Sequence, residues 1–311
     1  MTATPAPPLS PTSATRLAQY AATASVSVAI ALVVLKTIAW AKTGSVAMLG
    51  SLMDSALDAA ASTLNLLAVR AASEPADREH RFGHGKIEAI AGLGQALLIL
   101  ASGLFIVVQA VRGLVTPHPM EGGELGIAVT IIAMIATAAL VLYQRMVVAR
   151  TGSVAISADA LHYTGDLALN ATVILALLLA GPLHLPRADA VFGLIVAVLI
   201  GRNSLQIMQV AINQLLDREL SDGERQRIRS IIMSHPEVRN MHDLRTRVSG
   251  YDTFIQFHIE LEPKMALDRA HEISDQVEAS VREAFPGAQV LIHEDPVGLE
   301  RPPVFPPGRF V

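Results

Sequence analysis

Two segments of the chain place acidic and imidazole side chains at regular spacing inside apolar stretches. Asp54 and Asp58 are four residues apart, and so are His162 and Asp166. Residues four apart share one face of a helix, so each pair would present its two groups in one direction. Three carboxylates and one imidazole form a tetrahedral set suited to Zn²⁺ or a similar divalent ion. The alternative is that these groups are polar contacts between helices.

The stretches around these pairs are typical of membrane helices. Only 17% of the 311 residues are charged, against about 25% in ordinary soluble domains. Six apolar runs within residues 16–216 are long enough to cross about 30 Å of hydrocarbon. At a rise of about 1.5 Å per residue, both ligand pairs would lie near the middle of the bilayer, where ionisable groups are costly and mark a function by default. The six spans are expected at Tyr20–Trp40, Val46–Val69, Ile87–Val111, Leu125–Val148, Ser153–Leu179 and Ala190–Leu216.

Basic residues outside the spans predict the orientation, because cytoplasmic segments carry more Lys and Arg. The segment before the first span and the loops after the second and fourth spans contain Arg16, Arg70, Arg78, Arg81, Lys86, Arg145 and Arg150. The loops after the first, third and fifth spans contain only Lys42, Arg112 and Arg187. Both termini are therefore expected in the cytoplasm. Residues 1–15 show no periodicity and no signal-peptide pattern, so they are expected to be a disordered tail.

From Asp217 onward charged residues become frequent, and the pattern is that of a small α+β domain over residues 217–297. In one segment apolar residues alternate with polar ones at a period of two, which is the pattern of a half-buried strand. A Pro-rich tail is expected at residues 298–311. The expected order is helix, strand, strand, helix, strand, over Glu224–Ser234, Met241–Ser249, Thr253–Glu262, Leu267–Val281 and Gln289–His293.

Two further clusters have metal-ligand chemistry. The loop after the second span contains Asp77, His80 and His84, although such a loop can also be simply solvated. Asp159, three residues before His162, is an alternative ligand of the membrane site, with helix packing as its favoured role. The chain has no cysteine and a net charge of -4, which excludes thiolate sites and argues against a nucleic-acid partner. The tail domain concentrates His242, His258, His271 and His293, with Asp295 close behind.

Taken together, these segments resemble the cation diffusion facilitator family, in its bacterial zinc and ferrous-iron efflux branch. The resemblance covers nearly the whole chain except the two tails. Six motifs in the same order carry it, at Ser51–Asp58, Pro75–Glu88, Ala158–Asp166, Leu215–Leu220, His242–Arg247 and Ile292–Pro296.

The resemblance implies a homodimer in the inner membrane, in which each protomer has six transmembrane helices and a ferredoxin-like αββαβ cytoplasmic domain. It implies a transport site at Asp54, Asp58, His162 and Asp166, and a loop site at Asp77, His80 and His84. It further implies a two-metal cytoplasmic site of His242, His258, His271, His293 and Asp295, with Asp295 bridging. Lys86 and Asp217 would form an ion pair between the two parts. Glu294 departs from the Gln expected between the last two ligands.

The implied activity is proton-coupled export of a divalent cation, with Zn²⁺ as substrate and regulatory ligand, and Fe²⁺, Cd²⁺ or Mn²⁺ as other substrates. The chain lacks the Gly-rich Lys-Ser/Thr loop of ATPases, so it is expected to be a secondary transporter and not an enzyme. Two alternatives stay open. One is a membrane-bound metal sensor without transport. The other is an intramembrane aspartyl protease using Asp58 and Asp166, although it leaves His162 without a role.

Overall fold

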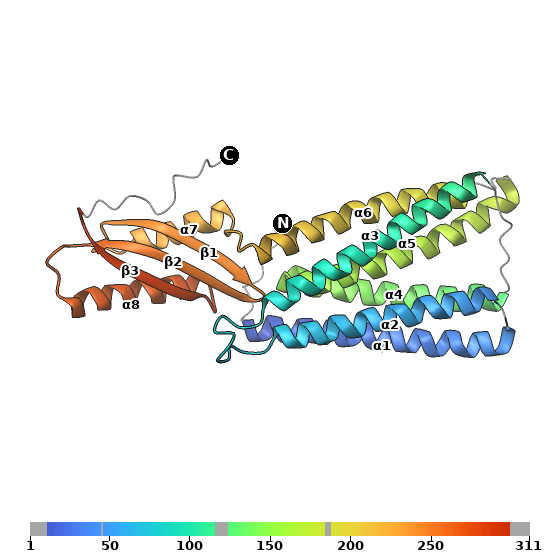
Figure 1. The fold of residues 1–311 in the computed structure, drawn as a ribbon, viewed down its shortest axis with the longest axis horizontal. Coiled ribbons are helices and arrows are strands. Elements are labelled where there is room, and N and C mark those ends of the chain that lie inside the picture. Colours follow the sequence, from blue (N-terminus) through green and yellow to red (C-terminus); the bar gives the residue numbers. More distant parts are fainter. Residues whose placement is uncertain (1–10, 45, 116–123, 184–187, 299–311) are drawn as a thin grey trace, which may run out of the picture. The chain divides into compact units, whose positions relative to one another are not determined.

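The computed structural model describes residues 11–44, 46–115, 124–183 and 188–298. They form two compact units, which divide between Ile212 and Asn213 and are described separately. The first unit is a bundle of six long helices (Figure 1). These helices are α1 (Pro11–Thr43), α2 (Val46–Ala72), α3 (Lys86–Val115), α4 (Glu124–Thr151), α5 (Val154–Leu183) and α6 (Ala188–Leu215).

The helices agree with the expected spans in number and order, with one correction at the start of the chain. Helix α1 begins at Pro11, inside the segment that was expected to be a disordered tail to residue 15. Proline suits a first helical position because the N–H it lacks would have no partner there. Residues 1–10 and 299–311, which include nearly all of the expected tails, lie outside the described residues.

Among the described residues, α1, α3, α4 and α6 are long and apolar enough to cross a membrane. Helices α2 and α5, which carry the two ligand pairs, are not in that set. The expectation of six membrane spans is therefore confirmed for four helices. Large apolar side chains such as Leu57, Leu104 and Leu142 are exposed on the bundle, as is usual for a surface that faces lipid.

Small residues bring the bundle helices close together. Helix α5 packs against α2, α3 and α4, and Ala155 and Ala158 on α5 are completely buried. Gly92 of α3 faces Val154 of α5 so closely that a Cβ on Gly92 would lie 2.7 Å from Val154 Cγ1. Close backbone approach through Gly and Ala is the usual way in which membrane helices pack.

The second unit has the expected αββαβ order. Its elements are α7 (Asp222–Met233), β1 (Asn240–Ser249), β2 (Asp252–Leu261), α8 (Leu267–Ala284) and β3 (Gln289–Pro296). The sheet order is β1-β2-β3, with β1 antiparallel and β3 parallel to β2. Helix α7 starts two residues earlier than expected, because Ser221 and Glu224 form a reciprocal capping box at its N-terminus.

The alternation in β2 separates a core from a polar face. Phe257 and Ile259 are buried and pack with Ile228 of α7 and Ile273 of α8. Because successive strand residues point to opposite faces, His258 lies on the other side of the sheet. One irregularity interrupts β1, where the register shifts between His242 and Arg245. This bulge inserts one extra residue directly beside His242.

Candidate metal sites

The structure brings together three of the four residues expected at the membrane site. His162 Nε2 lies 3.0 Å from Asp58 Oδ1 and 3.6 Å from Asp166 Oδ2. One ligand atom from each of the three lies within 4.8 Å of the others. Asp166 Oδ2 is buried and accepts no hydrogen bond from the described residues. Since buried acceptors are normally satisfied, this oxygen is where a bound cation would supply the missing partner.

Asp54 is the expected ligand that stays outside this group. It lies one turn before Asp58 on α2 and its side chain is exposed. The four-residue set is therefore assembled in the structure only as the triad of Asp58, His162 and Asp166, and the role of Asp54 remains a prediction.

Lys36 is a charged residue near this site that the sequence reasoning overlooked. Its Nζ donates to Ser55 Oγ at 2.7 Å and to the Ser51 carbonyl at 3.1 Å, which places an ammonium group between α1 and the first turns of α2. The signal was present in the sequence, because a lysine inside an apolar span is costly and by default functional.

Asp159 makes the interhelical contacts expected from the packing role that the sequence favoured. It is completely buried, and its two oxygens accept hydrogen bonds from side chains of α1, α2, α3 and α4. With four donors on two oxygens, the acceptor sites of this carboxylate are occupied.

The loop cluster is also assembled. Asp77 lies 3.4 Å from His80 Nδ1 and 3.5 Å from His84 Nε2, and the three residues form one possible metal group. The backbone N–H of His80 donates to Asp77 Oδ1, which lowers the pKa of this carboxyl below its ordinary value, and the N–H of Glu79 adds to the effect. The loop therefore presents an ionised carboxylate beside two imidazoles at neutral pH.

In the tail unit, three histidines lie in one row across the sheet. His242 pairs in register with His258, and His258 with His293. Asp295 is nearly buried and joins them, at 2.8 Å from His258 Nδ1, 3.4 Å from His242 Nε2 and 3.5 Å from His293 Nε2. His242, His258 and Asp295 form a possible metal group, with His293 beside it.

Three residues near this group have positions or contacts that the sequence did not predict. His271 on α8 is exposed, and its ring lies 3.7 Å from Asp275, so it is not brought into the row. Glu294 accepts a hydrogen bond of 2.6 Å from Ser274 of α8, which directs its carboxylate away from the histidines. Glu260 was overlooked, although it lies 3.2 Å from His242 Nδ1. Its position two residues after His258, on the same strand face, was the available signal.

The expected ion pair of Lys86 with Asp217 would join the two units and remains a prediction. Within the second unit, Asp217 Oδ1 lies 3.3 Å from Arg247 Nη1, so this carboxylate has a partner on β1.

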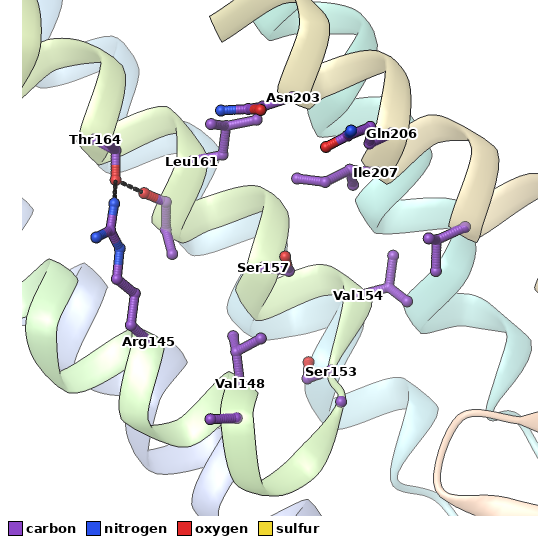
Figure 2. A pocket seen from close by; sticks show the side chains of 14 residues that line it. Arg145, Val148, Ser153, Val154, Ser157, Leu161, Thr164, Asn203, Gln206 and Ile207 are labelled. Atoms are coloured by element: carbon purple, nitrogen blue, oxygen red, sulfur yellow. Dashed lines mark hydrogen bonds between the residues drawn. The ribbon is translucent and has the colours of Figure 1, made fainter. Parts of the chain in front are cut away.

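A pocket of about 520 Å³ lies between α4, α5 and α6, beside the helix that carries His162 (Figure 2). At one side of the pocket Arg145 points toward Thr164, with Nη2 and Oγ1 3.4 Å apart. Among its described lining residues Arg145 is the one charged side chain, and neither a carboxylate nor an imidazole is present. The described lining of this pocket therefore lacks the carboxylate and imidazole groups that the three clusters offer to a cation.

Comparisons with known proteins extend these observations. Residues 22–216 match the family description "Cation efflux transmembrane domain", and residues 220–297 match "Cation efflux protein, cytoplasmic domain". The chain is 46% identical over 295 residues to the cation-efflux pump FieF of Cronobacter sakazakii, covering 95% of this chain and 97% of that protein. It is 46% identical over 281 residues to FieF of Klebsiella pneumoniae, with 90% and 93% covered. A solved cytosolic domain of a cation diffusion facilitator family protein is 28% identical and covers 24% of this chain and 92% of that one, with a TM-score of 0.23.

Proposed function

The chain belongs to the cation efflux, or cation diffusion facilitator, family, and we propose that it exports divalent metal cations in exchange for protons. The observation that carries this proposal is the triad of Asp58, His162 and Asp166, which includes a buried carboxylate oxygen without a donor. The names of the relatives, which are cation-efflux pumps, support the direction of transport.

Proton coupling follows from the chemistry of the ligands. A carboxylate or an imidazole binds a metal ion only after it has lost its proton, so metal and protons compete for the same groups. A secondary transporter exposes a site near the membrane midplane alternately to each side. In the state open to the cytoplasm the triad would take up the cation. In the state open to the other side it would release the cation and be reprotonated, with His162 among the groups that take up a proton.

The ligand types favour Zn²⁺ as the first substrate and allow others. Zn²⁺ accepts carboxylate oxygen and imidazole nitrogen in tetrahedral sites. Two carboxylates, or three if Asp54 joins in the loaded state, make a harder site, which Fe²⁺, Cd²⁺ and Mn²⁺ can also use. We therefore place Zn²⁺ first among divalent substrates.

The tail unit would regulate transport. His242, His258, His293 and Asp295 lie together on one face of a three-stranded sheet, where cytoplasmic metal could bind and tighten a homodimer. In this proposal the protein lies in the inner membrane with both termini in the cytoplasm. Basic residues in the α2–α3 loop and at the C-terminal end of α4 support that orientation.

The test is metal-dependent proton flux in proteoliposomes with purified protein. Asp58→Asn should abolish zinc flux, because the variant keeps the shape of the side chain and loses the charge that binds the ion. Asp222→Asn is the matched control, since Asp222 is an exposed carboxylate of α7, and it should transport as the wild type does. Wild-type flux from Asp58→Asn would refute the site. Metal binding without any flux in the wild type would favour a sensor.

A further inference from the structure

A buried carboxylate that the proposed transport cycle does not use lies one turn from the metal ligands. Asp159 Oδ2 accepts hydrogen bonds from Ser25 Oγ of α1 at 2.6 Å and from Gln144 Nε2 of α4 at 2.7 Å. Asp159 Oδ1 accepts from Gln95 Nε2 of α3 at 3.1 Å and from Ser62 Oγ of α2 at 3.5 Å. One residue of α5 thus joins four other helices of the bundle.

All four donors are neutral, and among the described residues no lysine or arginine forms an ion pair with Asp159. A buried carboxylate is costly unless hydrogen bonds replace its lost water. Removing any one of these donors would leave part of that cost uncompensated. The network therefore holds α5 in one position against its neighbours more firmly than apolar packing alone would do.

The network connects the same two helices that carry the triad. Asp159 is three residues before His162 on α5, and Ser62 is four residues after Asp58 on α2. Each member is thus one turn from a ligand and lies on the same face. Ser62 also contacts Tyr163, with 2.8 Å between their hydroxyl oxygens. Helices α2 and α5 are therefore linked twice, one helical turn apart. One link is the contact of Asp58 with His162, and the other is made by Ser62.

We propose that Asp159 is a positioning residue that sets the metal preference of the transport site. The rotation and spacing of α5 relative to α2 decide how far His162 and Asp166 stand from Asp58. Divalent ions differ in their ligand distances and in the number of ligands they require. A spacing that the Asp159 network holds rigid favours one ion, whereas a loosened spacing accepts several. The inference rests on the proposed transport function and adds to it the group that decides selectivity.

The experiment measures the ratio of zinc to manganese transport at equal protein in proteoliposomes. Asp159→Asn keeps the shape of the side chain, but it replaces one acceptor oxygen by an NH₂ group. That group would face a hydrogen-bond donor of the network and could not accept from it. Ser62→Ala removes the α2 arm alone. Both should move the Zn²⁺:Mn²⁺ ratio toward one by about tenfold, the lower end of what is typical when partners that orient metal ligands are removed.

The matched control is Ser204→Ala. Ser204 is completely buried and donates a hydrogen bond of 2.6 Å to the Ala96 carbonyl, which joins α6 to α3 outside the network. This control should keep the wild-type metal ratio even if it lowers the unfolding temperature.

A ratio has the advantage that it does not depend on how much protein is folded. If Asp159→Asn and Ser62→Ala lower stability but keep the wild-type ratio, Asp159 is only structural and the inference is overturned. If Asp159→Asn does not fold, Ser62→Ala and Gln95→Met carry the test with the same expected shift. Failure of the transport function itself would be seen separately, as the absence of metal flux in the wild type, and failure of the site as flux that survives Asp58→Asn.

Discussion

The close approach of α3 to α5 at Gly92 allows a sharp test of how the bundle positions its ligands. A Cβ added at Gly92 would lie 2.7 Å from Val154 Cγ1 and 3.3 Å from the Val154 backbone carbon and oxygen. The backbone atoms cannot rotate away, so Gly92→Ala must push the two helices apart. Gly94 is the matched control, because nothing lies within 4 Å of a Cβ built there.

The magnitude follows from two opposing effects. Replacing Gly by Ala within a helix stabilises it by about 0.5–1 kcal/mol. Overpacking a close contact costs about 1–3 kcal/mol. Gly92→Ala should therefore lower the free energy of unfolding by about 1–2 kcal/mol, whereas Gly94→Ala should leave it unchanged or raise it slightly.

The assay is unfolding in detergent for both variants, followed by zinc flux in proteoliposomes. Gln95 of the Asp159 network lies three residues after Gly92 on α3. Ser153, immediately before α5, donates a hydrogen bond to Glu88 of α3. A displacement of α3 should therefore also weaken transport in Gly92→Ala. Equal stability and equal flux in the two variants would refute the close packing of α3 on α5.

Three further predictions concern the metal clusters and the tail. Glu260→Gln should weaken the zinc affinity of the tail site by about tenfold, whereas Glu294→Gln should change this affinity by no more than about twofold. Calorimetry on protein with the other sites mutated would measure both. Zinc affinity of the transport site should fall as the pH is lowered, because a protonated His162 cannot bind metal, and His162→Asp should change this dependence. The Arg269 guanidinium holds the pKa of Glu237 below its usual value. The stability that this pair contributes is therefore present above about pH 4.3, the ordinary pKa of Glu. It is lost as the pH falls through the lower pKa of the folded state. Glu237→Gln should therefore speed hydrogen exchange in the tail at pH 7 and have no effect at strongly acid pH; equal exchange at pH 7 would contradict the pair.

Local periodicity was sufficient to predict the elements. The apolar runs predicted six helices, and the alternation from Ile255 to Leu261 predicted a strand whose polar face carries His258. The spacing of four also predicted which ligands share a helix face, since that relation depends only on the helical repeat. Local patterns were less reliable at the ends of elements, as the start of α1 at Pro11 shows.

Tertiary structure decided which of these groups meet. Asp54 and Asp58 are equivalent in the sequence pattern, yet only Asp58 contacts His162, because the choice depends on how α2 is rotated against α5. Ser25 is 134 residues away from Asp159 and still donates to it. The bulge beside His242 and the turning of Glu294 toward Ser274 likewise arise from packing between elements. Spacing along one element is a local property of the backbone, whereas contacts between elements depend on side-chain packing over the whole unit, which no single stretch of sequence contains.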